Sequence, residues 1–289
     1  MMDTSHIKRK WLNRAYANQS PTQKLDIYLP ELGRGPFPVI VSIHGGAWMF
    51  GDKGDMMNAP MLHGLERGYA VVCINYRLSH EAIFPCQIHD CKAAIRYIRA
   101  NASAYYFDPQ RIAAWGGSAG GHLAALLGTT GRIRRLSDDS MGNPKVSSAV
   151  QAVVDWYGPT ESFLKMDEQL AASGRGVPDH ARPDSPESLL LGRLITEVPE
   201  LVEQASPMTY IKSYAPPFLI QHGMQDGIVP VEQSIHFAAE LGRVAGASKV
   251  SFEILPEAQH ADPAFETPGN VERVLDFLDS HLRLPLTKE

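Results

Sequence analysis

The chain has 289 residues, 44% of them apolar and 20% charged, and a formal net charge of −5. This length suffices for a large buried core, in one domain or two. The negative charge argues against nucleic acid as a partner. No run of 18 apolar residues occurs, and no apolar segment follows the basic residues near the N-terminus. We therefore expect a soluble, cytoplasmic protein without a membrane span or a signal peptide.

The cysteines and histidines give no sign of a disulfide framework or a metal site. Cys73, Cys86 and Cys91 are an odd number in a long chain and lack the C-x-x-C spacing of zinc and redox sites, so we expect reduced, structural thiols. The eleven histidines contain no H-x-x-x-H or H-E-x-x-H pattern. We therefore expect neither a metal nor a cofactor.

Strand and helix patterns alternate along most of the chain. Strands are predicted at 24–30, 39–44, 69–76, 111–115, 149–158, 217–223 and 249–255, and helices at 61–68, 86–106, 121–128, 231–246 and 270–282. The near-continuous apolar runs among the strands are typical of a parallel sheet that is buried on both faces. The alternation predicts a single α/β domain over 1–289, with an open, mostly parallel sheet and helices on both faces.

Residues 160–210 interrupt this alternation. The segment is longer than an ordinary connection and mixes glycine, proline and polar residues with short helical stretches. We interpret it as a cap or lid inserted over the carboxyl edge of the sheet, with a functionless excursion as the alternative.

Ser118 lies in a G-x-S-x-G motif within the segment "WGGSAGGHLAAL" (115–126). The motif follows a predicted strand and opens a predicted helix, which is the context that exposes a serine hydroxyl above a sheet. Gly116 and Gly120 lack the Cβ atoms that would collide in so sharp a turn. Ser118 is therefore the candidate nucleophile, and a structural turn serine is the alternative.

A serine nucleophile needs a base and a carboxylate that orients the base. Asp226 and His260 each follow a predicted strand, so the order along the chain is Ser, Asp, His, as this sheet type requires. Asp155 also ends a strand and is a rival for the acid, but only Asp226 lies in a glycine-flanked loop that is free to reach a histidine. Histidines in predicted helices, at 236 and 281, are weaker candidates for the base.

The segment "HGGAW" (44–48) follows a buried strand and predicts an oxyanion site. Gly45 and Gly46 have no side chains that would keep a substrate from their backbone amides, and the amide of Ala119 begins a helix. Acyl transfer develops an oxyanion that such amides stabilise. We expect these three amides to form the oxyanion hole, and His44 to brace the loop.

Two further pairs of residues are singled out near this edge of the sheet. Trp48 and Trp156 follow or end strands, so each is interpreted either as a wall of the substrate pocket or as part of the core. Arg77 and Asp90 are expected to form a structural ion pair that anchors the intervening loop.

Several motifs together make the sequence resemble the α/β-hydrolases of the hormone-sensitive-lipase-like carboxylesterase branch. They are "HGGAW" (44–48), "NYRLSHEAIFPCQIHD" (75–90), "GGSAGG" (116–121), "DWYGP" (155–159) and "HGMQDGIVP" (222–230). The sequence is most similar to the bacterial group that contains bifunctional feruloyl and acetylxylan esterases. Two departures are Gly117, where many relatives carry an acidic or hydroxyl residue, and Ala261, which follows the histidine where glycine is frequent.

The resemblance implies an α/β-hydrolase fold, a triad of Ser118, Asp226 and His260, and oxyanion donors at Gly45, Gly46 and Ala119. It also implies a serine carboxylesterase that acts through an acyl-enzyme on small acyl or aromatic esters, such as feruloyl or acetyl esters of plant xylan oligosaccharides. An arylformamidase-like amide hydrolase is the enzymatic alternative. A non-catalytic small-molecule receptor is the other, but such receptors lose a triad member and this sequence retains all three.

Overall fold

Within the residues that the structure describes, a single sheet of eight strands forms the centre. The structure is a computed structural model and describes residues 1–282. The strand order is β1-β2-β4-β3-β5-β6-β7-β8. The strands are β1 (Lys10–Ala15), β2 (Lys24–Tyr28), β3 (Phe37–Ile43), β4 (Ala70–Ile74), β5 (Phe107–Gly117), β6 (Ala152–Trp156), β7 (Phe218–Gly223) and β8 (Val250–Leu255). β2 pairs antiparallel with β1 and β4, and all other neighbours are parallel, so the predicted mostly parallel sheet is confirmed.

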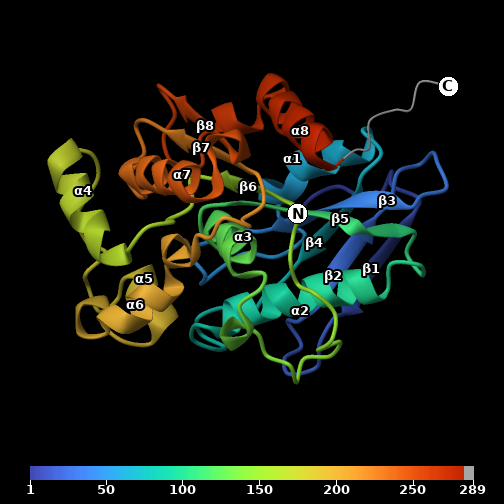
Figure 1. Cartoon of the computed structure of the whole chain (residues 1–289), viewed down its shortest axis with the longest axis horizontal. Helices are drawn as coiled ribbons and strands as arrows, with labels where there is room; N and C mark the ends of the chain where they lie inside the picture. Colours follow the sequence, from blue (N-terminus) through green and yellow to red (C-terminus); the bar gives the residue numbers. More distant parts are fainter. Residues whose placement is uncertain (283–289) are drawn as a thin grey trace.

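Helices cover both faces of the sheet, as predicted. α2 (Cys86–Ala100), α3 (Ala119–Thr130) and α7 (Glu232–Ala245) pack on one face, and α1 (Ala59–Leu62) and α8 (Pro268–Leu282) pack on the other. Figure 1 shows α2 and α8 on opposite sides of the strands. β3 and β4 are buried at every residue because both of their faces are covered, which explains their near-continuous apolar sequences.

The edge strand β1 has no counterpart among the predicted strands. Its six residues, KWLNRA, are exposed or half-buried, and its pairing with β2 is irregular between Trp11 and Arg14. A solvated edge strand lacks the alternating or continuous apolar pattern by which buried strands are identified. Its sequence therefore carries too weak a signal to be found.

Residues 160–210 connect β6 to β7 and form α4 (Met166–Ser173), α5 (Pro186–Leu191) and α6 (Pro199–Ala205) with short 3-10 turns between them. Figure 1 shows these helices grouped at one end of the molecule, away from β1 and β2. The segment packs on the loop after β7, where Nε2 of His180 lies 2.9 Å from the carbonyl oxygen of Ile228. None of its residues lines the cavity that opens beside Ser118. A lid function for this segment stays a prediction.

The three cysteines are free thiols, two of them buried and Cys86 partly exposed. Within residues 1–282, no helix has both the length and the apolar character that a membrane crossing requires.

Candidate active site

Ser118 stands at a sharp turn between β5 and α3. Its φ of 55° lies in the left-handed region, which a residue with a side chain seldom adopts. Two glycines make the turn possible. A Cβ on Gly116 would lie 2.4 Å from the backbone of Gly120, and a Cβ on Gly120 would lie 2.1 Å from the carbonyl oxygen of Ile43. The turn therefore depends on the glycines of the motif, as the sequence predicts.

His260 and Asp226 reach Ser118 from two other loops at the same edge of the sheet. Nε2 of His260 lies 2.9 Å from Oγ of Ser118, and Nδ1 of His260 lies 2.7 Å from Oδ2 of Asp226. A carboxylate can only accept, so Nδ1 of His260 carries the proton and Nε2 is free to accept the serine hydroxyl. The structure thus brings the three predicted residues into one hydrogen-bonded chain.

Asp226 is held as a buried carboxylate. Burial by itself raises the pKa of Asp226, but the imidazoles of His222 and His260 outweigh burial and leave this pKa well below its ordinary value. Its second oxygen, Oδ1, accepts hydrogen bonds from the amides of Ile228 and Val229, each at 2.9 Å. The carboxylate is therefore charged and fixed, with Oδ2 facing His260.

The rival acid, Asp155, lies buried at the end of β6 and makes different contacts. Its Oδ1 accepts from the amide of Gly158 at 3.0 Å, and its Oδ2 has no hydrogen-bond partner among the residues that the structure describes. Burial raises the pKa of Asp155 to about 6. Asp226, and not Asp155, is the carboxylate against His260.

In the loop after β3, the set of free backbone amides differs from the predicted set. The amide of Gly45 donates to Sδ of Met57 at 3.0 Å, so it is already engaged. Within residues 1–282, the amides of Gly46, Ala47 and Ala119 have no acceptor. Gly46 and Ala47 both have positive φ, 99° and 53°. The structure thus replaces Gly45 with Ala47 among the candidate oxyanion donors. Every residue except proline has a backbone amide, so the sequence alone does not distinguish Ala47 from the two glycines before it.

The interpretation of Trp48 as a pocket wall requires correction. Trp48 is 2% exposed, lines no part of the cavity beside Ser118, and donates its indole N–H to Nδ1 of His122 at 3.2 Å. Burial lowers the pKa of His122 to about 4, so this imidazole is neutral, and its Nε2 lies 2.7 Å from the carbonyl oxygen of Ala205. A buried indole needs an acceptor, and His122 supplies one beneath the loop. Trp156, in contrast, does line the cavity.

A cavity of about 310 Å³ opens beside Ser118. Most of its lining is apolar, and Glu266 and Asn58 are among its few polar groups. The apolar and aromatic part of the wall includes Phe50, Met57, Met61, Trp156, Tyr157 and Ile228. Such a cavity lies at the lower end of the size range of small-molecule sites.

Gly117, one of the two departures from the related sequences, makes room for Tyr157. A Cβ on Gly117 would lie 2.7 Å from the hydroxyl oxygen of Tyr157. The Tyr157 ring is held edge-on between His260 and Phe265, with ring centroids 5.0 and 4.5 Å away. The phenol therefore occupies space that a side chain at 117 would otherwise fill.

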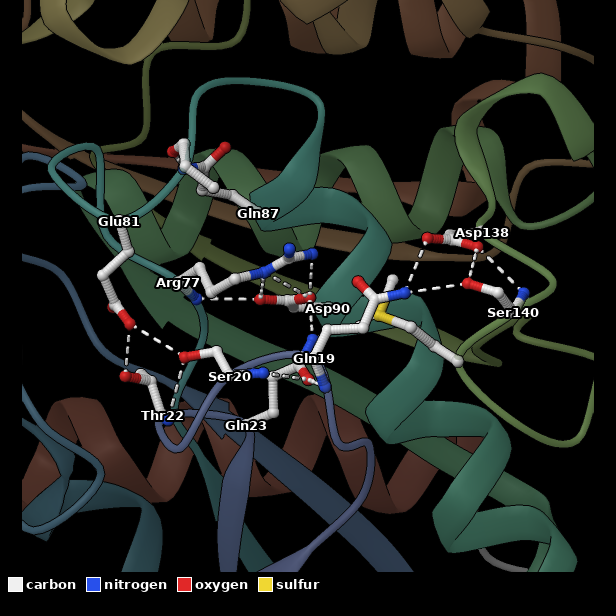
Figure 2. Close-up of polar contacts among 12 residues, drawn as sticks. Gln19, Ser20, Thr22, Gln23, Arg77, Glu81, Gln87, Asp90, Asp138 and Ser140 are labelled. Carbon is white, nitrogen blue, oxygen red and sulfur yellow. Dashed lines mark hydrogen bonds and ion pairs between the residues drawn. The ribbon is translucent and has the colours of Figure 1, made fainter.

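A polar cluster anchors the loop that follows β4. Nη2 of Arg77 lies 2.8 Å from Oδ1 of the fully buried Asp90, which also accepts from Nε2 of Gln23 at 2.7 Å (Figure 2). The predicted ion pair is confirmed. Two residues further on, the amide of Ser79 donates to the carbonyl oxygen of Trp48 at 2.9 Å. The cluster thus supports the loop that carries the free amides.

Comparisons with known proteins agree with this architecture. The family model BD-FAE matches residues 25–241. The esterase LipQ of Mycobacterium tuberculosis is 35% identical over 259 residues, which cover 88% of this chain and 58% of the relative. The probable carboxylic ester hydrolase LipM of the same organism is 35% identical over 86% of this chain and 55% of its own length. The chain therefore spans little more than half the length of these relatives.

Two solved structures share the fold at 33% identity. A bifunctional GH43-CE protein of Bacteroides eggerthii superimposes with a TM-score of 0.84 over 95% of this chain and 38% of its own. A truncated form of a carbohydrate esterase from gut microbiota gives the same TM-score over 95% and 96% of the two chains. Because the family model matches residues 25–241, which are most of this chain, the chain is an α/β-hydrolase that belongs to the BD-FAE family.

Proposed function

We propose that the chain is a serine carboxylester hydrolase that works through an acyl-enzyme. The observation that carries the proposal is the chain of contacts from Ser118 through His260 to Asp226, at 2.9 and 2.7 Å, beside an apolar cavity. Esterase activity in the names of two relatives supports the same reaction class.

In the first half of the proposed reaction, Oγ of Ser118 bonds to the acyl carbon while Nε2 of His260 takes the hydroxyl proton. The carbonyl electron pair moves to oxygen, and the free amides of Gly46, Ala47 and Ala119 stabilise the resulting oxyanion. The loss of one such donor typically costs about 3 kcal/mol. The bond to the alcohol then breaks, and the alcohol leaves with the proton from His260.

In the second half, water replaces the alcohol. The water oxygen bonds to the acyl carbon while Nε2 of His260 takes a proton from the water. When the second oxyanion collapses, the bond from the acyl carbon to Oγ of Ser118 breaks, the proton passes from His260 to Oγ, and the acid is released. Asp226 stabilises the imidazolium in both halves and keeps Nε2 directed at the serine.

We further propose that the substrates are small acyl or aromatic esters, including feruloyl or acetyl esters of plant xylan oligosaccharides. Family membership supports this class, as do the two structural neighbours named as a carbohydrate esterase and a GH43-CE protein. A cavity of about 310 Å³ with Trp156 and Tyr157 in its wall is suited to a small acyl group or one aromatic ring.

The test is a comparison of initial rates on methyl ferulate, p-nitrophenyl acetate and a formylated aromatic amine, with Ser118→Ala as the control. We expect Ser118-dependent turnover of the two esters. Acetate release without ferulate release would reduce the proposal to a small-acyl esterase, and faster amide cleavage would favour a formamidase. Turnover by Ser118→Ala at the wild-type rate would refute the mechanism.

A further inference from the structure

A second histidine, His222, lies against the candidate catalytic acid. It is the fifth residue of β7 and is fully buried. Its Nε2 lies 2.9 Å from the carbonyl oxygen of Val229 and 3.2 Å from Oδ2 of Asp226. That carboxylate oxygen is also the one that faces Nδ1 of His260. Two imidazoles therefore share one oxygen of Asp226.

The partners of His222 determine which of its nitrogens carries a proton. A carbonyl oxygen can only accept, so Nε2 of His222 bears the hydrogen that points toward Val229. The other nitrogen, Nδ1, lies 2.7 Å from Oγ of Ser234, in the first turn of α7. The hydroxyl of Ser234 can donate to Nδ1, and together the two contacts hold the His222 ring in a single orientation.

These contacts close a ring around the loop that carries Asp226. The amide of Val229 donates to Oδ1 of Asp226, and the carbonyl group of the same residue accepts from His222. Both polar backbone groups of Val229 are thus held, one by the acid and one by His222. The ring leaves Asp226 little freedom to turn, and it places the N–H group of His222 beside Oδ2.

We propose that His222, oriented by Ser234, is a positioning residue for the ester hydrolysis proposed above, on which this inference rests. It fixes the loop of Asp226 and stabilises the charge on Oδ2, so that His260 keeps its hydrogen bond to a carboxylate of constant orientation. His222 does not touch the serine. Asp155 is the other buried carboxylate that interacts electrostatically with His222, and it makes none of the contacts of the ring.

The test compares His222→Leu with His222→Gln, because a glutamine amide can place an N–H near the position of Nε2 and leucine cannot. We expect His222→Leu to lower kcat/KM for p-nitrophenyl acetate about 10- to 100-fold, the range seen when a residue that orients a functional ligand is lost. His222→Gln should recover most of this loss. Without the N–H beside Oδ2, Asp226 attracts the proton on His260 more strongly, so the acidic limb of the pH–rate profile should move to higher pH in His222→Leu and stay in place in His222→Gln.

Ser234→Ala is the milder variant, since it removes one hydroxyl and leaves His222 in the core. We expect a smaller loss of kcat/KM with a pH shift in the same direction. Wild-type rate and profile in His222→Leu and Ser234→Ala would overturn the proposal. Equal losses in the leucine and glutamine variants with an unmoved pH profile would also overturn it, because they would indicate a structural role alone.

Failure of the proposed function would look different. It would appear as a wild-type protein without Ser118-dependent turnover. The hydrogen bond from His260 to Asp226 can be followed without turnover, by the low-field proton resonance of Nδ1–H of His260. We expect this resonance to shift in His222→Leu and to return in His222→Gln, and an unchanged resonance in both variants would count against the positioning role.

Discussion

Replacing Asp226 by asparagine removes the charge beside His260 and nearly preserves the shape of the side chain. The amides of Ile228 and Val229 both donate to Oδ1, so the carbonyl oxygen of the asparagine should take that position and its NH₂ group should face His260. An NH₂ group cannot accept from Nδ1. His260 is then expected to move its proton to Nε2, which loses the lone pair that accepts the proton of Ser118.

From this change of tautomer we expect kcat to fall by about 10⁴-fold, as it does in triads with the same geometry. At about 1.4 kcal/mol for each factor of ten, the barrier rises by about 5.5 kcal/mol. The assay is the initial rate on p-nitrophenyl acetate at pH 7.5, with circular dichroism as the check on folding.

Asp155→Asn is the matched control, because it makes the same chemical change at the rival carboxylate, which does not contact His260. We expect this variant to keep its activity. The reasoning would be refuted if Asp226→Asn retained more than about a tenth of the wild-type kcat, or if activity were lost at Asp155 instead.

Three further outcomes are expected. Activity should rise with pH as His260 loses its proton, and a rate that stays constant from about pH 5 to 8 would contradict its role as the base. Burial raises the pKa of Asp155 from 3.8 to about 6. At 1.36 kcal/mol for each pKa unit, this difference corresponds to about 3 kcal/mol of free energy. This contribution to the free energy of unfolding is fully present below about pH 4 and is lost as pH rises through about 6. Denaturant unfolding should show the decline in the wild type and not in Asp155→Asn. Gly117→Ala should lower stability by about 1–3 kcal/mol because its Cβ meets Tyr157 at 2.7 Å, and Tyr157→Phe in the same chain should recover part of the loss in Tm. Equal Tm values for Gly117→Ala and the wild type would show that the phenol moves freely.

The placement of the candidate triad could be predicted because it depends on backbone topology alone. In a parallel sheet, the loops after successive strands meet at one edge, whatever the side chains do there. Ser118, Asp226 and His260 each follow a strand whose apolar sequence is easy to identify. Asp226 and Asp155 both satisfy this rule. The glycine-flanked loop favours Asp226 in the sequence, and the distance of 2.7 Å from its Oδ2 to Nδ1 of His260 separates the two in the structure.

The partners of individual side chains could not be predicted in the same way, because they depend on which face of the sheet each residue takes. Gln221 and His222 are neighbours in a strand that is buried at every position, so their sequence gives no hint of a difference. In the structure they point to opposite faces. Oε1 of Gln221 accepts from the indole of Trp156 at 2.7 Å on the side of α8, whereas His222 meets Ser234 of α7 and the loop of Asp226. A shift of one residue in the register of β7 against β6 would exchange these roles. The strand pairing therefore decides which of two buried polar residues lies against Asp226, the candidate catalytic acid, and a single sequence does not contain that pairing in its local pattern.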